Sequence, residues 1–273
     1  MHDIELHHGV HIPVLGLGTW QLQGQDCVDA VTQALAVGYR HIDTALHYGN
    51  HTDIARAIQS CQVSREEVFI TSKIWHEDLT PSSIEQQTHQ ILSELETDYV
   101  DLLLIHWPNS RYDLIQAVSA LEEQRRDGKV RSIGVSNFTQ RHLETVQQAE
   151  VAISMNQVEY HPSLNQERLR QYCQSRGIAM TAYSPLAQGQ DLKLNLIQEL
   201  AERYDVSPSQ VVLNWLLQKG IVAIPRSKNP DYIADNLAAT RWQLTEADVA
   251  AIDAIGGHNR ILNPPFAEFN DEM

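Results

Sequence analysis

Short β-branched or apolar runs alternate along the chain with longer segments of helical periodicity, and this alternation restricts the fold more than any other feature. Eight runs have the length and composition of strands: Val14–Thr19, Arg40–Thr44, Val68–Ile74, Tyr99–His106, Val130–Ser136, Ile153–Glu159, Ile178–Ser184 and Ile221–Pro225. Helical periodicity lies between them, as in Cys27–Ala36, Ser82–Leu95, Leu114–Asp127, Gln140–Ala149 and Gln166–Ser175. Repeated strand–helix units favour a parallel sheet, and eight units predict a closed (β/α)8 TIM barrel.

Two features lie outside the eightfold pattern. His2–Pro13 resembles a short β-hairpin with Gly9-Val10 near its turn, and we expect it to cover the amino-terminal mouth of the barrel. Extra helices are predicted after strands seven and eight, at Leu194–Tyr204, Pro208–Gln218, Pro230–Ala239 and Glu246–Ile255. No linker or low-complexity segment interrupts the chain, so we expect one domain over residues 1–273.

The charge balance and the cysteine content restrict the partners and the compartment. With 20 basic and 35 acidic residues the formal net charge is −15, whereas nucleic acids and anionic membranes require a basic face. Cys27, Cys61 and Cys173 are too few and too far apart for a disulfide framework. No apolar run reaches the roughly 18 residues of a membrane span. We therefore expect a cytoplasmic protein that binds neither nucleic acid nor membrane.

Polar and aromatic residues cluster at the predicted strand ends, where barrel enzymes place their active sites. The ends carry Thr19-Trp20, Asp43 with Tyr48, Lys73 with Trp75, His106-Trp107, Ser136-Asn137, Gln157, Tyr183-Ser184 and Pro225-Arg226-Ser227. Taken singly, an aspartate at a strand end is often a helix cap, and a lone histidine is often structural. The convergence of Asp43, Tyr48, Lys73 and His106 on one mouth instead predicts a catalytic group.

These four side chains have the chemistry for carbonyl reduction, which requires a hydride donor and a proton donor for the developing alkoxide. Tyr48 is the candidate acid. Lowering its pKa by about three units corresponds to roughly 4 kcal/mol, which the Lys73 ammonium supplies from about 4 Å at an effective dielectric of 20. Asp43 would keep Lys73 charged and oriented, and His106 would hydrogen-bond the substrate carbonyl.

The same residues resemble the catalytic tetrad of the aldo-keto reductase family. Gly38–Ala45 (GYRHIDTA) with Tyr48-Gly49-Asn50 is similar to the family's first signature, Lys129–Phe138 (KVRSIGVSNF) to its second, and Ile224–Ser227 (IPRS) to its third. The likeness extends from about Pro13 to Pro265. The short loops and the ending Asn259–Pro265 (NRILNPP) most resemble bacterial 2,5-diketo-gluconate and methylglyoxal reductases.

The resemblance implies NADPH as cofactor and assigns residues to it. Ser136, Asn137 and Gln157 would bind the nicotinamide carboxamide, Tyr183 would stack on the ring, and Arg226-Ser227-Lys228 would bind the adenosine phosphate, with Asn236 near the adenine. The full set of implied cofactor residues is Gly18, Thr19, Trp20, Asp43, Ser136, Asn137, Gln157, Tyr183, Ser184, Leu186, Pro225, Arg226, Ser227, Lys228, Tyr232, Asp235 and Asn236. The expected substrate pocket consists of Trp20, Tyr48, Trp75, His106 and Trp107.

The chain departs from the family pattern at four positions. His51 occupies a usually acidic position and Ala55 a glycine position, and we expect a change in helix capping without loss of catalysis. Tyr232 occurs where an arginine often binds the adenosine phosphate, and Asp235 where glutamate is common. The missing charge predicts a preference for NADPH that is weakened but not abolished, with measurable use of NADH.

Three other interpretations fit the sequence less well. Gly16-Leu17-Gly18-Thr19 lacks the third glycine of a Rossmann fingerprint, and the histidines lack the spacing of a metal site, so no metal is expected. A non-catalytic NADP(H)-sensing partner subunit is the alternative function, as potassium-channel β subunits have this fold. The complete tetrad and the lack of long docking loops favour a reductase, which we expect to be a monomer with an open pocket for small aldehydes and ketones.

Overall fold

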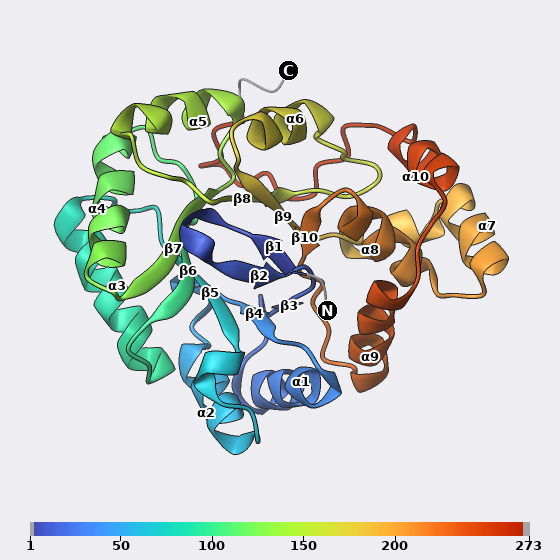
Figure 1. The fold of residues 1–273 in the computed structure, drawn as a ribbon, viewed down its shortest axis with the longest axis horizontal. Coiled ribbons are helices and arrows are strands. Elements are labelled where there is room, and N and C mark those ends of the chain that lie inside the picture. The colour runs from blue at the N-terminus through green and yellow to red at the C-terminus, as the bar shows by residue number, and fades with distance from the viewer. Residues whose placement is uncertain (1–2, 270–273) are drawn as a thin grey trace.

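The fold is known from a computed structural model, which describes residues 3–269 and contains all eight predicted strands in the predicted order (Figure 1). The strands are β3 (Leu17–Gly18), β4 (His41–Asp43), β5 (Phe69–Ile74), β6 (Val100–Ile105), β7 (Val130–Ser136), β8 (Met155–Glu159), β9 (Ala179–Tyr183) and β10 (Ile221–Ala223). Most are a few residues shorter than predicted, because the residues at their ends leave the parallel ladder to form the loops of the barrel mouths.

The eight strands form one parallel sheet in sequential order from β3 to β10. The two edges of the sheet meet through a parallel bridge between Leu15 and Ala223. Around this bridge the Gly16 amide donates to the Ala223 oxygen and the Ala223 amide donates to the Val14 oxygen, both at 2.9 Å. The sheet is thus closed, and the predicted (β/α)8 barrel is confirmed.

Helices surround the barrel and bury their apolar faces against it (Figure 1). They are α1 (Gly24–Val37), α2 (His51–Ser60), α3 (Pro81–Leu95), α4 (Leu114–Arg126), α5 (Gln140–Val146), α6 (Glu167–Ser175), α7 (Asn195–Tyr204), α8 (Pro208–Gln218), α9 (Pro230–Ala238) and α10 (Glu246–Asp253). α3 begins at Pro81, one residue before the predicted range, because the Thr80 side chain accepts the Ser83 amide and caps the helix. The extra helices after strands seven and eight are α7 with α8 and α9 with α10.

The predicted amino-terminal hairpin is also present. β1 (Asp3–Glu5) pairs antiparallel with β2 (His11–Pro13), and a short 3-10 turn, η1 (His7–Gly9), joins them. Figure 1 shows this hairpin across the centre of the barrel. Its apolar side chains, Leu6 and Ile12, join a buried cluster with the barrel-lining residues Phe69, Leu102, Leu104, Met155, Val222 and Ile224. Phe69 begins β5, so the hairpin closes the amino-terminal end and leaves the carboxyl end for the site. Residue His2, which the prediction included, lies outside the described residues.

Candidate active site

The four predicted catalytic residues meet at the carboxyl ends of adjacent strands. Lys73 of β5 donates a hydrogen bond from Nζ to Asp43 Oδ1 of β4 at 2.6 Å and another to the Thr44 oxygen at 2.7 Å. Both ionised side chains are fully buried. The Lys73 Nζ atom lies 5.1 Å from the centre of the Tyr48 ring, and the His106 ring lies edge-on to Tyr48 at 5.6 Å. The structure therefore brings all four together.

Tyr48 is held in place by the turn that carries it. This turn, η2 (Leu46–Tyr48), ends at Gly49, whose φ of 64° is in the left-handed region that glycine adopts without a steric penalty. The following Asn50 is buried and accepts a hydrogen bond from the Thr44 hydroxyl, while its amide nitrogen donates to the Thr19 and Leu22 oxygens. Asn50 thus joins the ends of β3 and β4 to the segment that presents Tyr48.

Burial dominates the electrostatics of the site. It raises the pKa of Asp43 and lowers the pKa of Lys73, and their mutual attraction opposes both changes. Burial, with Asp43 and Tyr183 nearby, raises the pKa of Tyr48 well above its usual 10. This is opposite to the lowering by Lys73 that the sequence predicts. The main reason is burial of the phenol, which disfavours the phenolate, and the nearby Asp43 carboxylate adds to the increase.

His106 is neutral in this environment. Burial lowers its pKa well below 6.5, and Lys73, His47 and His76 lower it further. The Asn137 side chain donates to the His106 backbone oxygen at 3.0 Å and fixes the residue, whereas the buried ring atom Nδ1 has no hydrogen-bond partner among the described residues. A neutral imidazole with uncommitted hydrogen-bonding capacity is suited to contact a carbonyl oxygen.

Of the three tryptophans predicted to line the substrate pocket, Trp20 lies beside Tyr48 and Trp75 beside His106. Three further aromatic residues, which the sequence did not predict, lie with them. Trp20 lies 4.8 Å from Tyr48, and His47 stacks on Trp75 at 3.7 Å with an angle of only 6° between the rings. Phe266, from the distant C-terminal segment, lies 5.8 Å from Trp75 and 5.4 Å from Trp107, and it also stacks near His76. His47 could have been predicted because it directly precedes Tyr48 in the sequence. No sequence pattern near Phe266 indicates that it reaches this site.

Four predicted nicotinamide-binding residues lie directly beside the tetrad. Gln157 Nε2 donates to Asp43 Oδ2 at 2.7 Å, and the Ser136 hydroxyl donates to the Gln157 backbone oxygen at 2.8 Å. The Tyr183 hydroxyl donates to Asn137 Oδ1 at 2.7 Å. Asn137 itself has a φ of 63°, an unusual backbone conformation that these contacts stabilise. Amide and hydroxyl groups are thus grouped next to an aromatic ring and the buried ion pair, a donor set that fits a nicotinamide.

The residues predicted to hold the adenosine end lie where β3 meets β10. A Cβ atom on Gly18 would approach the Ile224 oxygen to 2.7 Å, so the two strands require glycine here. Arg226 is exposed and forms no ion pair within residues 3–269, while Tyr232 is 64% exposed. Lys228 differs from expectation, because its Nζ pairs with Asp26 of α1 at 3.0 Å.

Several other predicted cofactor residues form hydrogen bonds with neighbouring residues of the protein. Both Asp235 carboxylate oxygens accept hydrogen bonds from the start of α8, from Ser207, Ser209 and Gln210. The Thr19 hydroxyl donates to the Asp43 backbone oxygen, and Asn236 is buried in α9. Pro225 accepts the Gly18 amide, and Ser227 forms a turn with Asn229. Ser184 and Leu186 begin the connection that follows β9.

His51 begins α2 as expected, but its side chain is part of an unexpected network. The buried ring contacts Glu94 of α3 through Nδ1 at 2.9 Å and the Ser72 hydroxyl of β5 through Nε2 at 3.0 Å. His51 therefore joins two helices to the strand that carries Lys73, whereas the sequence predicted only a change of cap. Within the described residues, no cluster of histidine, cysteine or acidic side chains could hold a metal ion, and no helix could cross a membrane.

Comparison with known proteins identifies relatives with this architecture. The model of the Aldo/keto reductase family matches residues 14–256. The glyoxal reductase of Bacillus subtilis (strain 168) is 41% identical over 261 residues, which cover 94% of each chain. Methylglyoxal reductase DkgB of Yersinia pestis is 39% identical, covering 93% of this chain and 96% of that protein. The crystal structure of MGS-M4, an aldo-keto reductase from a Medee basin deep-sea metagenome library, superposes with a TM-score of 0.93 at 34% identity, covering 99% of both chains.

Proposed function

Because the chain belongs to the aldo/keto reductase family and is an oxidoreductase, we propose that it reduces small aldehydes and ketones to alcohols with NADPH, using Tyr48 as the proton donor. Methylglyoxal, 2,5-diketo-gluconate-like compounds and aromatic aldehydes are the proposed substrates. The names of the relatives support small dicarbonyls. The aromatic wall of Trp20, Trp75 and Trp107 supports planar substrates.

The convergence of Tyr48, Lys73, Asp43 and His106 carries this proposal. NADPH, when bound, supplies the hydride for the carbonyl carbon. Neutral His106 orients the carbonyl oxygen by hydrogen bonding. The raised pKa of Tyr48 keeps its proton in place at neutral pH, and the alkoxide, a stronger base than phenolate, takes that proton. The Lys73 ammonium, held by Asp43, then stabilises the phenolate until it is reprotonated.

The preference for NADPH rests on Arg226, whose guanidinium suits bidentate contact with the 2′-phosphate. Two features weaken that preference. Tyr232 brings no charge, and Lys228 must leave Asp26 before it reaches a phosphate. We expect kcat/KM to favour NADPH over NADH by roughly ten- to a hundredfold, since one charged contact is worth about 1.5–3 kcal/mol. Equal or better efficiency with NADH would contradict the proposed role of Arg226.

Replacement of the proposed acid tests the mechanism. Tyr48→Phe should lower kcat for methylglyoxal about a hundredfold or more while the Kd for NADPH stays within about threefold, because only the proton donor is removed. Oxidation of NADPH followed by absorbance gives kcat, and fluorescence titration gives Kd. A Phe variant with near-normal turnover would refute Tyr48 as the acid. A wild-type protein that binds NADPH but reduces no carbonyl would instead favour the sensing subunit.

A further inference from the structure

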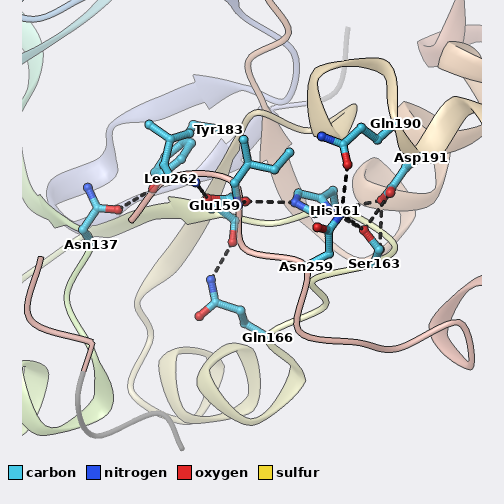
Figure 2. Close-up of polar contacts among 11 residues, drawn as sticks. Asn137, Glu159, His161, Ser163, Gln166, Tyr183, Gln190, Asp191, Asn259 and Leu262 are labelled. Carbon is cyan, nitrogen blue, oxygen red and sulfur yellow. Dashed lines mark hydrogen bonds and ion pairs between the residues drawn. The ribbon is translucent and has the colours of Figure 1, made fainter. Parts of the chain in front are cut away.

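A buried charged cluster lies outside the proposed catalytic group, just beyond the end of β8. His161 is fully buried between two carboxylates: its Nε2 lies 3.0 Å from Glu159 Oε1, and its Nδ1 lies 3.0 Å from Asp191 Oδ2. Ser163 adds a hydroxyl, which donates to Asp191 Oδ1 at 2.6 Å. Figure 2 shows Glu159, His161, Ser163 and Asp191 as one chain of polar contacts. The mechanism proposed above uses none of these four residues.

The geometry requires a protonated ring. A neutral imidazole has one N–H and could donate to only one of two flanking carboxylates, whereas the imidazolium donates to both. Burial alone would lower the pKa of His161, but the hydrogen bonds to Asp191 and Glu159 outweigh burial and raise it. Glu159 of β8 and Asp191 of the turn η6 (Asp191–Lys193) are the charged groups that face the ring. The other polar contact of the ring is Ser163.

The two carboxylates belong to different parts of the active-site mouth. Glu159 accepts the backbone amides of Ile261 at 2.7 Å and Leu262 at 2.8 Å, and so fixes the C-terminal tail (residues 258–269). Asp191 lies in the β9–α7 segment (residues 184–194), which contains the predicted cofactor contacts Ser184 and Leu186. His161 is therefore a buried charged link between the tail and this segment.

Both linked segments border the proposed substrate and cofactor sites. Past Leu262 the tail places Phe266 against Trp75 and Trp107. The β9–α7 segment follows Tyr183 and contains three non-glycine residues with positive φ, Ser184, Ala187 and Gln188. Such backbone persists only where surrounding contacts hold it, and Asp191 supplies contacts of this kind. Glu159 and Gln157 are two residues apart on β8, so their side chains share one face of the strand.

We propose that His161 is a positioning residue whose imidazolium, held between Glu159 and Asp191, fixes the C-terminal tail and the β9–α7 segment together and thereby sets the cofactor site. The part that concerns the cofactor rests on the proposed function. The linkage itself does not, because it is a property of the protein without ligand. It also has a definite pH dependence. Since the pKa of His161 is raised in the folded protein, the linkage is complete below about pH 6.5 and is lost as pH rises through the higher folded value.

Amide hydrogen exchange tests the linkage directly. Asp191 does not contact the tail amides, yet Asp191→Asn should lower the protection factors of Ile261 and Leu262 about fivefold or more, because His161 then loses its charge and keeps only a weaker, neutral hydrogen bond to Glu159. His161→Gln should have the same effect and should remove any pH dependence of the protection between pH 6 and 9.5. Protection factors, rather than rates, correct for base catalysis of exchange. If His161→Gln does not fold, the result for Asp191→Asn alone tests the linkage.

A second connection between the segments must be removed first. The Asn259 side chain donates to the Ser163 hydroxyl at 3.1 Å and to Gln190 Oε1 at 3.4 Å, which offers other paths from the β9–α7 segment to the tail. The Asn259 amide also donates to the Ser163 backbone oxygen at 3.1 Å, and its own protection factor reports on that remaining path. All variants are therefore made in an Asn259→Ala background, which is the matched control. The proposal is overturned if Asp191→Asn in this background lowers protection at the Ser163 amide, which Asp191 accepts at 2.9 Å, but leaves Ile261 and Leu262 unchanged.

Steady-state kinetics test the consequence for the cofactor. His161→Gln, or Asp191→Asn in its place, should raise the KM for NADPH about five- to twentyfold and change kcat less than about threefold, since the tetrad is untouched. A lower kcat with an unchanged KM would overturn the assignment to cofactor positioning. Failure of the wild-type protein to use NADPH would refute the proposed function, while the exchange result would still decide the linkage.

Discussion

At the scale of single residues, the buried pair of Lys73 and Asp43 has a structural and a chemical role that can be separated. Each side chain neutralises the other in a site from which water is excluded. Removing one partner of a buried ion pair commonly costs about 3–5 kcal/mol, because the other is left uncompensated. Loss of activity in a single variant would therefore not distinguish catalysis from folding.

A double variant makes that distinction. Lys73→Met should lower the free energy of unfolding by about 3–5 kcal/mol and should also lower kcat. Adding Asp43→Asn removes the isolated carboxylate and should restore part of the stability, but kcat should stay low because no ammonium stabilises the Tyr48 phenolate. Urea unfolding and steady-state assays report the two effects. If the double variant regains activity together with stability, Lys73 is only structural.

At the scale of elements, the strands fix the four converging residues, and the C-terminal tail adds an aromatic ring, Phe266, against Trp75 and Trp107. Asp43 and Lys73 lie in hydrogen-bonded strands, whereas the tail reaches the mouth only through contacts of separate residues. One contact is between Glu159 and the Ile261 and Leu262 amides. Others are the hydrogen bonds of Asn259 to Ser163 and those of Glu268, which accepts the Ser110 amide at 2.9 Å. Changes in the tail should therefore alter substrate selection more than the chemical step.

Phe266→Ala tests this division. The ring is 39% exposed and contacts Trp75 and Trp107. An aromatic contact is worth about 0.5–1.5 kcal/mol, so the KM for an aromatic aldehyde such as benzaldehyde should rise about two- to tenfold. The KM for methylglyoxal, which has no ring, serves as the matched control and should change little. Equal changes for both substrates would mean that the tail acts on the site in general and not on ring recognition.

At the scale of the whole molecule, ion pairs on the outer layer join helices that are distant in sequence. Lys219, directly after α8, donates to Glu167 of α6 at 3.2 Å and to Asp253 of α10 at 2.6 Å. The hydrogen bond from Arg170, together with the Lys219 charge, lowers the pKa of Glu167 to about 2. A carboxylate with a lowered pKa contributes stability above its unfolded pKa of about 4.3, and this contribution is lost as pH falls through the folded value.

Glu167→Gln should therefore destabilise the protein at pH 7 and have progressively less effect between about pH 4.5 and pH 2, because protonation removes the same charge from the wild type. Urea midpoints measured across this range provide the test. A difference between the two proteins that stays constant down to pH 2 would show that packing of the side chain, rather than its charge, is responsible.

The sequence by itself determined the barrel and the identity of the four converging residues. The chain has eight apolar runs of strand length with helical periodicity between them. These patterns are local, because each depends only on residues that are close together in the sequence. Parallel strands put their carboxyl ends at one mouth, so Asp43, Tyr48, Lys73 and His106 could be grouped without coordinates. The family motifs lie in the same segments, which is why they pointed to the same reaction class.

The tertiary structure alone decided how these groups interact, because charge, burial and long-range contact are set by residues far apart in the chain. Tyr48 is so deeply buried, with the Asp43 carboxylate nearby, that its pKa is raised and not lowered. Phe266 joins the pocket from a segment whose path depends on the backbone hydrogen bonds to Glu159. Asp191, 30 positions away, folds against His161 and together with Glu159 raises the pKa of its ring. No local pattern encodes these distances, since each depends on how the closed barrel brings separate loops to one mouth.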